Sequence, residues 1–428
     1  MIRSDEDNLD LAGSVDGVDA INAKFYGRFP FPWLPQVFDC PTDPDFETRA
    51  LNQSVGSWDH SVIPQRAKIW VAGCGTNQAV FTALRFRNAT IIGSDVSESS
   101  LALCAGTAKQ LGITNLTLRQ ESVNRVSYSG EFDYIICTGV IHHNTDPGLS
   151  LQKLATALKP SGVLELMVYN RYHRVLTTAF QKAVRAFGAE KRNDFETEMR
   201  IARDIIEGAS LNNTMSLFLQ QYRDCPEAQL ADGLLQPVEY SFTVESLGEL
   251  AARCGLEFLA PCLSLYDRRK EIGFWNMEFD NEELQRRYDS LPDSRRWQIT
   301  NLLQLEKSPM LWFYFQRRDA SRPRKTELQL TQEFLDVKFI RSETMRRAYI
   351  RMEDGNYALC ERLSPYPGTH RYELCRTILN TFSNRPGASM KEVLEELEIE
   401  AHFRLVNKLR LVLTTNALPF LTAVTNGA

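Results

Sequence analysis

The segment from Lys68 to Asp95 constrains the fold of this chain more than any other stretch. It contains an apolar run, a glycine turn at Gly73 to Gly75, a helical pattern, a second apolar run and a terminal acid (KIWVAGCGTNQAVFTALRFRNATIIGSD). Two strands joined through a helix form a right-handed crossover in a parallel sheet. Glycines let the backbone approach a ligand, and an acid about 20 residues further on can accept hydrogen bonds from a ribose. The segment therefore predicts an α/β sheet that binds a nucleotide-like ligand at Asp95.

The glycine pattern departs from the dinucleotide-binding fingerprint. No third glycine follows Gly73 and Gly75 in the sequence TNQA, so a close approach of the helix to a pyrophosphate is not indicated. The sequence VAGCGTNQ, with Asp95 beyond it, resembles motif I and the ribose-binding acid of class I S-adenosylmethionine-dependent methyltransferases. The usual turn of that family is G-x-G-x-G. Here Asn77 takes the place of the third glycine, and Asn tolerates a left-handed backbone.

Two later segments resemble the same family in the expected order and spacing. Residues Glu131 to Pro147 (EFDYIICTGVIHHNTDP) resemble its F-D-x-[IV]…[GS]-V-[LI]-H-H-x-x-D-P segment, and an L-K-P-x-G-x-L turn follows at Lys159 to Gly162. Apolar runs at 256–265 and 310–315 supply the last two strands. The resemblance implies a seven-stranded, doubly wound, Rossmann-like methyltransferase sheet.

The resemblance also implies S-adenosylmethionine as the cofactor. The glycine turn would hold its methionine part and Asp95 its ribose. Ser122 stands where the family usually has an Asp for the adenine amino group, and the neighbouring Glu121 is an alternative acceptor. The N-terminal segment with Tyr26, Phe29, Pro30, Phe31 and Pro32 resembles the family's Y-x-x-[YF]-P-[YF]-P arm, which either packs on the core or covers the cofactor as a lid. The predicted cofactor-binding residues are Tyr26, Gly73, Cys74, Gly75, Gln78, Asp95, Val96, Glu121, Ser122, Val123, Thr138, Gly139 and Val140.

Candidate catalytic residues follow the fourth and fifth predicted strands. They are His142, His143, Tyr169 and His173. A hydroxyl acceptor needs a base, and histidine titrates in the useful range, whereas an amine acceptor needs only to be neutral and aligned. His142 and His143 are equally consistent with structural hydrogen bonds, and the segment from Tyr169 to Arg174 with a solvated helix start. No Asn-Pro-Pro-Tyr motif follows the fourth strand, which argues against methylation of a nucleobase amine.

Composition narrows the class of protein. The 428 residues are 43% apolar and 24% charged, with a net charge of −5, which is ordinary for a globular protein and argues against a general polyanion binder. No apolar run reaches the ~18 residues of a membrane-spanning helix, and the acidic first residues do not resemble a targeting peptide. Nine scattered cysteines and six histidines form no ligand-spaced metal cluster. These features favour a cytoplasmic protein with free thiols and no metal.

The pattern along the chain suggests three parts. Residues 1–20 are predicted to be a flexible acidic lead, and residues 21–318 a methyltransferase domain with an aromatic lid at 21–40 and a helical cover inserted at 176–235. After a polar linker, residues 326–428 carry short helical patterns and a hairpin around Gly355, which predict a small C-terminal α+β domain similar to a winged helix. This domain has no basic stripe, which argues against nucleic-acid binding and favours dimerisation or presentation of a substrate.

The sequence therefore predicts a methyltransferase that moves a methyl group from S-adenosylmethionine to an O or N atom of a small molecule or metabolite by in-line displacement. Two alternatives stay open. One is a protein or peptide methyltransferase whose C-terminal domain holds the substrate. The other is a non-catalytic cofactor-binding protein with this fold. The expected partners are a small-molecule or peptide substrate and a second copy in a homodimer, with no nucleic acid and no membrane.

Overall fold

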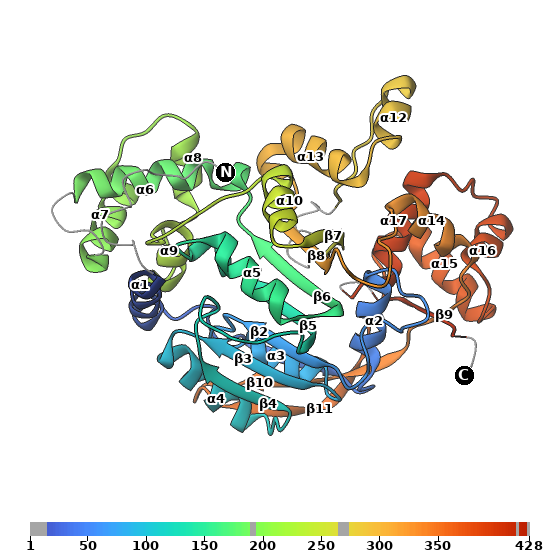
Figure 1. Ribbon diagram of the computed structural model, residues 1–428, viewed down its shortest axis with the longest axis horizontal. Helices are drawn as coiled ribbons and strands as arrows, with labels where there is room; N and C mark the ends of the chain where they lie inside the picture. The colour runs from blue at the N-terminus through green and yellow to red at the C-terminus, as the bar shows by residue number, and fades with distance from the viewer. Residues whose placement is uncertain (1–14, 189–193, 264–273, 417–418, 426–428) are drawn as a thin grey trace.

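The computed structural model describes residues 15–188, 194–263, 274–416 and 419–425. Within them, a central sheet of seven strands has the order β4-β3-β2-β5-β6-β8-β7 (Figure 1). The first five strands in this order are parallel, and β8 is antiparallel to both of its neighbours. Since β7 then runs in the same direction as the first five, the carboxyl ends of six strands share one edge. This arrangement confirms the predicted seven-stranded sheet. The strands are β2 (Lys68–Ala72), β3 (Thr90–Asp95), β4 (Leu116–Gln120), β5 (Phe132–Thr138), β6 (Leu158–Val168), β7 (Leu256–Pro261) and β8 (Leu311–Arg317).

Helices cover both faces of this sheet, because alternate side chains of each strand point to opposite faces. In β2, Trp70 and Ala72 belong to one buried apolar cluster, whereas Ile69 and Val71 belong to another. The two clusters form the two layers of core on either side of the sheet, as a doubly wound fold requires. The first cluster includes helices α5 (Pro147–Ala157), α10 (Val244–Arg253) and α13 (Asp293–Gln304), and the second includes α2 (Phe46–Ser54), α3 (Gln78–Arg85) and α4 (Glu98–Gln110).

Two of these helices begin at side-chain caps. The side chain of Ser97 accepts a hydrogen bond from Ser100 N at the start of α4. Thr243 and Ser246 form a reciprocal capping box at the start of α10. Each cap satisfies backbone groups that have no partner inside the helix, and such caps are worth about 1 kcal/mol.

The N-terminal segment is helical earlier than its composition predicts. Helix α1 spans Val15–Arg28, so residues 15–20 of the predicted flexible lead are ordered. The reason is a buried stripe at helical spacing, Val18, Asn22 and Phe25. Together with Phe29, Phe25 joins an apolar cluster with the predicted helical cover. The cover consists of α6 (Val175–Phe187), α7 (Phe195–Gly208), α8 (Thr214–Gln220) and α9 (Glu227–Leu234).

The C-terminal part contains the predicted hairpin and short helices, but the two do not form one body. Strands β10 and β11 pair with β1 (Val37–Pro41) of the N-terminal segment, whereas β9 pairs with β12 beside the helices. The Tyr357 hydroxyl also donates to Pro35 O at 2.7 Å. The hairpin is therefore shared with the methyltransferase domain, and the winged-helix likeness stays a prediction. The elements are α14 (Glu327–Asp336), β9 (Phe339–Arg341), β10 (Thr344–Arg351), β11 (Tyr357–Tyr366), α15 (Glu373–Asn384), α16 (Met390–Glu396), α17 (Phe403–Thr414) and β12 (Leu421–Ala423).

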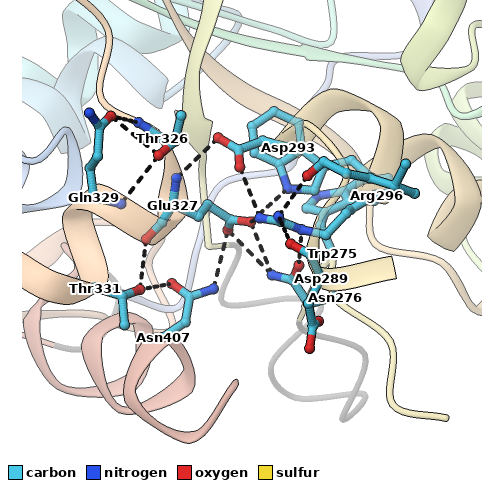
Figure 2. A network of polar contacts seen from close by, with 12 residues as sticks. Trp275, Asn276, Asp289, Asp293, Arg296, Thr326, Glu327, Gln329, Thr331 and Asn407 are labelled. Carbon is cyan, nitrogen blue, oxygen red and sulfur yellow. Dashed lines mark hydrogen bonds and ion pairs between the residues drawn. The ribbon is translucent and has the colours of Figure 1, made fainter. Parts of the chain in front are cut away.

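A buried polar network joins the C-terminal helices to α13. Arg296 of α13 donates from Nη2 to Asp293 Oδ1 and to Glu327 Oε2, both at 2.8 Å (Figure 2). Trp297 Nε1 also donates to Glu327 at 3.2 Å, and Asn407 Nδ2 of α17 does so at 3.4 Å. Glu327 is therefore the acceptor at which three helices meet.

Among the described residues, no helix has both the length and the apolar character needed to cross a bilayer.

Candidate functional site

A cavity of about 490 Å³ lies at the carboxyl edge of the parallel strands. Its wall comes from the glycine turn, the ends of β3 and β5, helix α1, the arm at 31–32 and the helical cover. Every one of the thirteen predicted cofactor-binding residues lines this cavity. They are Tyr26, Gly73, Cys74, Gly75, Gln78, Asp95, Val96, Glu121, Ser122, Val123, Thr138, Gly139 and Val140.

Asp95 ends β3, and its carboxylate joins that strand to the glycine turn. Oδ2 accepts from Gly75 N at 2.8 Å, and Oδ1 accepts from Ser97 N at 2.9 Å. Burial raises the pKa of Asp95, and the backbone hydrogen bonds from Ser97, Gly75 and Val96 act against that rise. Each carboxylate oxygen can accept a further hydrogen bond, and the side chain lines the cavity. The acid is therefore held rigidly with capacity left for a diol.

The aromatic arm is fixed on the glycine turn. Gly75 has φ +53°, and a Cβ there would lie 2.7 Å from Phe31 O, so the arm passes too close for any side chain. The Thr76 hydroxyl donates to Pro32 O, and Asn77 Nδ2 donates to Trp33 O at 3.1 Å. Asn77 has φ −153°, so its place at the third glycine requires no left-handed backbone. The arm thus packs on the core and also walls the cavity through Phe31 and Pro32.

At the adenine end predicted from the family resemblance, two acceptors from α1 line the cavity that the sequence did not indicate. Asp19 is hydrogen-bonded by the side chains of Ser122 and Asn124, and burial raises its pKa. Among the described residues, its Oδ2 and the Oδ1 of Asn22 are buried without a hydrogen-bond partner. Glu121, the alternative acceptor, also lines the cavity, but its Oε2 already accepts from the Tyr128 hydroxyl at 2.6 Å.

His143 and Tyr169 also line the cavity, and the backbone oxygen of His143 accepts from Asn22 Nδ2 at 2.9 Å. His143 Nδ1 is 2.8 Å from Val238 O, and burial lowers the pKa of the ring to about 4. The ring is therefore neutral near pH 7, with Nδ1–H donating and Nε2 able to accept. The Tyr169 ring lies 4.2 Å from the Arg174 guanidinium, and burial raises the pKa of its hydroxyl.

The other two catalytic candidates do not line the cavity. His142 is fully buried, its ring centre lies 3.9 Å from that of Tyr169, and among the described residues neither of its ring nitrogens has a hydrogen-bond partner. His173 Nε2 lies 2.8 Å from Ser308 O. His173 is thus held by a hydrogen bond outside the cavity, whereas His142, within the described ranges, is packed in the core without one.

Asp232 of helix α9 is a further cavity residue without a sequence signal. Its Oδ1 accepts from Gln236 Nε2 at 2.9 Å, and the same amide lies 3.0 Å from the Tyr26 hydroxyl. Burial raises the pKa of Asp232 to about 7, against the opposing effects of Arg174 and Gln236. An acid on an amphipathic helix is usually solvated, so only the packing of α9 over the sheet edge identifies this residue.

Comparison with known proteins identifies the fold and the family. Residues 71–215 match a family model described as a methyltransferase domain. PKMT2 from Rickettsia typhi has a similar fold, with a TM-score of 0.57 and 13% identity over 92% of this chain and 77% of that one. Its complex with AdoHcy, the demethylated cofactor, gives 0.55 and 15% over 88% and 73%. Residues 71–215 therefore form a class I S-adenosylmethionine-dependent methyltransferase domain.

Two curated relatives of this methyltransferase show how far the similarity extends. An uncharacterized protein from Synechococcus sp. is 29% identical over 308 residues, which are 69% of this chain and 71% of that protein. A ubiquinone biosynthesis O-methyltransferase from Acinetobacter baumannii is 28% identical over 106 residues, or 24% of this chain and 44% of that enzyme. The chain therefore matches less than half the length of the ubiquinone enzyme.

S-adenosylmethionine is the cofactor of this methyltransferase, and the cavity fits it. The volume of about 490 Å³ falls within the range of ordinary cofactor sites. The Asp95 carboxylate can accept from hydroxyls, and the unpartnered oxygens of Asp19 and Asn22 can accept from an amino group.

Proposed function

We propose that this methyltransferase transfers a methyl group to an O or N atom of a small molecule by in-line displacement. The observation that carries the proposal is a single cavity lined by the thirteen predicted cofactor residues and also by His143, Tyr169 and Asp232. The cofactor supplies an electrophilic methyl carbon, so the protein's part is to orient both reactants and exclude water. The similarity to a ubiquinone biosynthesis O-methyltransferase supports a small-molecule acceptor.

In this proposal the turn from Gly73 to Gly75 holds the methionine part of the cofactor and Asp95 holds the ribose hydroxyls. Asp19 accepts from the adenine amino group in place of the family's Asp. The reason is its hydrogen bond with the side chain of Ser122, the residue that occupies the position of that Asp. In the same cavity, His143 Nε2 and the Tyr169 hydroxyl orient the methyl acceptor.

Asp95→Ala tests the ribose assignment. We expect the affinity for S-adenosylhomocysteine to fall by about 1.5–3 kcal/mol, or roughly 10- to 150-fold, because charge-assisted hydrogen bonds are lost. Isothermal titration measures it, and Asp95→Asn, which retains one oxygen acceptor, should lose less. Glu98→Ala, at an exposed position three residues further on, is the matched control and should bind normally. An unchanged affinity in the folded Asp95→Ala variant would refute the assignment.

Asp19→Ala tests the adenine assignment. Wild type should bind S-adenosylhomocysteine more tightly than S-inosylhomocysteine, in which a carbonyl replaces the amino group. We expect Asp19→Ala to reduce that preference by about 10-fold, since roughly 1–2 kcal/mol of hydrogen bonding to a charged acceptor is lost. The exposed neighbour Asp16→Ala serves as the control. If Asp19→Ala keeps the wild-type preference, the base is recognised elsewhere.

A further inference from the structure

Among the described residues, the charged side chains that line the cavity are all acidic. Among the described residues that line it are four carboxylates, and no lysine or arginine is among them. The four are Asp19, Asp95, Glu121 and Asp232. Asp19, Asp95 and Glu121 are assigned to the cofactor by the placement proposed above, whereas Asp232 is joined to Tyr26 through the Gln236 amide. A wall of this kind disfavours an anionic acceptor and favours a cationic one.

Among the residues that the structure describes, no cation forms an ion pair with Asp232, although Arg174 is near enough to lower its pKa. Within the same residues, Gln236 is the donor to its carboxylate. Arg174 is the nearby cation, but Glu239 binds it in a bidentate pair at 2.8 and 2.6 Å. Gln181 Nε2 adds a further hydrogen bond to Glu239 at 3.0 Å. An uncompensated carboxylate in a largely buried wall is costly unless a ligand supplies the positive charge.

The neighbours of Asp232 suit an ammonium group. The phenol rings of Tyr26 and Tyr169 line the same cavity as Asp232. Aromatic rings attract cations. The Gln236 amide holds both the Tyr26 hydroxyl and Asp232 Oδ1, so the acid and the phenol keep a fixed relative position. The raised pKa of Asp232 agrees with a buried carboxylate that has no cation bound to it.

We propose that the methyl acceptor is an amine and that Asp232 recognises its ammonium group. Before transfer the ammonium gives one proton to the Asp232 carboxylate, which frees the nitrogen lone pair. The nitrogen then bonds to the methyl carbon as the bond between that carbon and sulfur breaks, and neutral S-adenosylhomocysteine leaves. This inference rests on the proposed function, because it concerns the acceptor end of the same cavity. An alkyl ammonium group occurs both on free small amines and on lysine side chains. The shared chemistry is a single positive charge at the end of an apolar chain, and the experiment below separates the two sources.

The test is a titration of the full-length protein saturated with S-adenosylhomocysteine at pH 8.5. Hexylamine and hexanol differ mainly in charge. We expect hexylamine to bind at least 10-fold more tightly than hexanol, and we expect Asp232→Asn to reduce this ratio below about 3-fold. The substituted amide can still accept from Gln236, so the fold around it is retained. Asp224→Asn removes a charge from an exposed position in the cover and should leave the ratio unchanged.

A second arm compares hexylamine with Nα-acetyl-lysine methylamide. Tighter binding of the amide indicates a lysine source, and tighter binding of hexylamine indicates a free amine; either result supports recognition of ammonium. Equal binding of hexylamine and hexanol, absence of hexylamine binding, or an Asp232→Asn variant with the wild-type ratio overturns the inference. Failure of the wild type to bind S-adenosylhomocysteine, which is measured first, would instead refute the proposed function.

Discussion

Glu327→Ala should lower the free energy of unfolding by about 3–5 kcal/mol, the usual cost of breaking a buried ion pair from one side. Glu327 is 2% exposed and accepts from Arg296 Nη2 at 2.8 Å and from Trp297 Nε1 at 3.2 Å (Figure 2). Without Glu327, the Arg296 guanidinium keeps its ion pair with Asp293 but loses the second of its two carboxylate partners. Arg410, 1% exposed, also depends on Glu327, since burial lowers its pKa and the charge of Glu327 acts against that.

Urea denaturation followed by tryptophan fluorescence measures this effect, because Trp297 lies in the network. Gln332→Ala is the matched control: the residue is exposed on the same helix, α14, and its loss should change stability by less than about 0.5 kcal/mol. If Glu327→Ala costs less than about 1 kcal/mol, Asp293 alone compensates Arg296, and the network does not fasten the C-terminal helices.

Asp232→Asn should stabilise the protein, and more at alkaline than at acidic pH. Burial raises the pKa of Asp232 from 3.8 to about 7, so the folded state binds this proton more tightly than the unfolded chain. The resulting stabilisation is fully present below about pH 4 and is lost as the pH rises through about 7. Asparagine avoids that loss. The expected gain is roughly 3–4 kcal/mol at pH 8 and about 2 kcal/mol less at pH 5.5.

The ionisable groups around Asp232 have folded-state pKa values outside the range between pH 5.5 and pH 8. Burial raises the pKa values of Tyr26 and Tyr169 above their ordinary value, and burial lowers that of His143 to about 4. Burial would raise the pKa of Glu239, but Arg174 outweighs it and keeps that pKa low. Urea denaturation at the two pH values, with Asp224→Asn as the control, measures the difference. A gain that is the same at both pH values would show that Asp232 does not titrate between them.

The sequence predicted the cofactor half of the site because its residues are local to strand ends. Gly73, Asp95 and Thr138 each stand at or just after the end of a parallel strand, so the sheet brings them to one edge whatever the rest of the chain does. Asp19 and Asp232 could not be found in this way. They lie on α1 and α9, whose position over the cavity depends on an apolar cluster assembled from distant segments.

The paired histidines show a second limit of sequence reasoning. His142 and His143 are adjacent in one motif, and both lie in the short 3-10 turn from Ile141 to His143. That turn directs His143 to the cavity, whereas His142 packs beside Tyr169. Their different surroundings arise from Tyr169, which directly follows β6, and from Val238, which follows the cover. No local sequence pattern indicates either contact.

The pairing of β1 with β10 joins the N-terminal segment that walls the cofactor cavity to the C-terminal part of the chain. The arm residues at 31–33 contact the glycine turn, and a few positions later the same segment enters a sheet with residues 344–366. A protease cut between α14 and the hairpin, followed by loss of the C-terminal fragment, would take away β10, the partner strand of β1. Such a nicked enzyme should lose cofactor affinity although every cofactor-lining residue is intact. The hairpin of β10 and β11 is therefore expected to stabilise the wall of the cofactor cavity, although it lies far from that wall in the sequence.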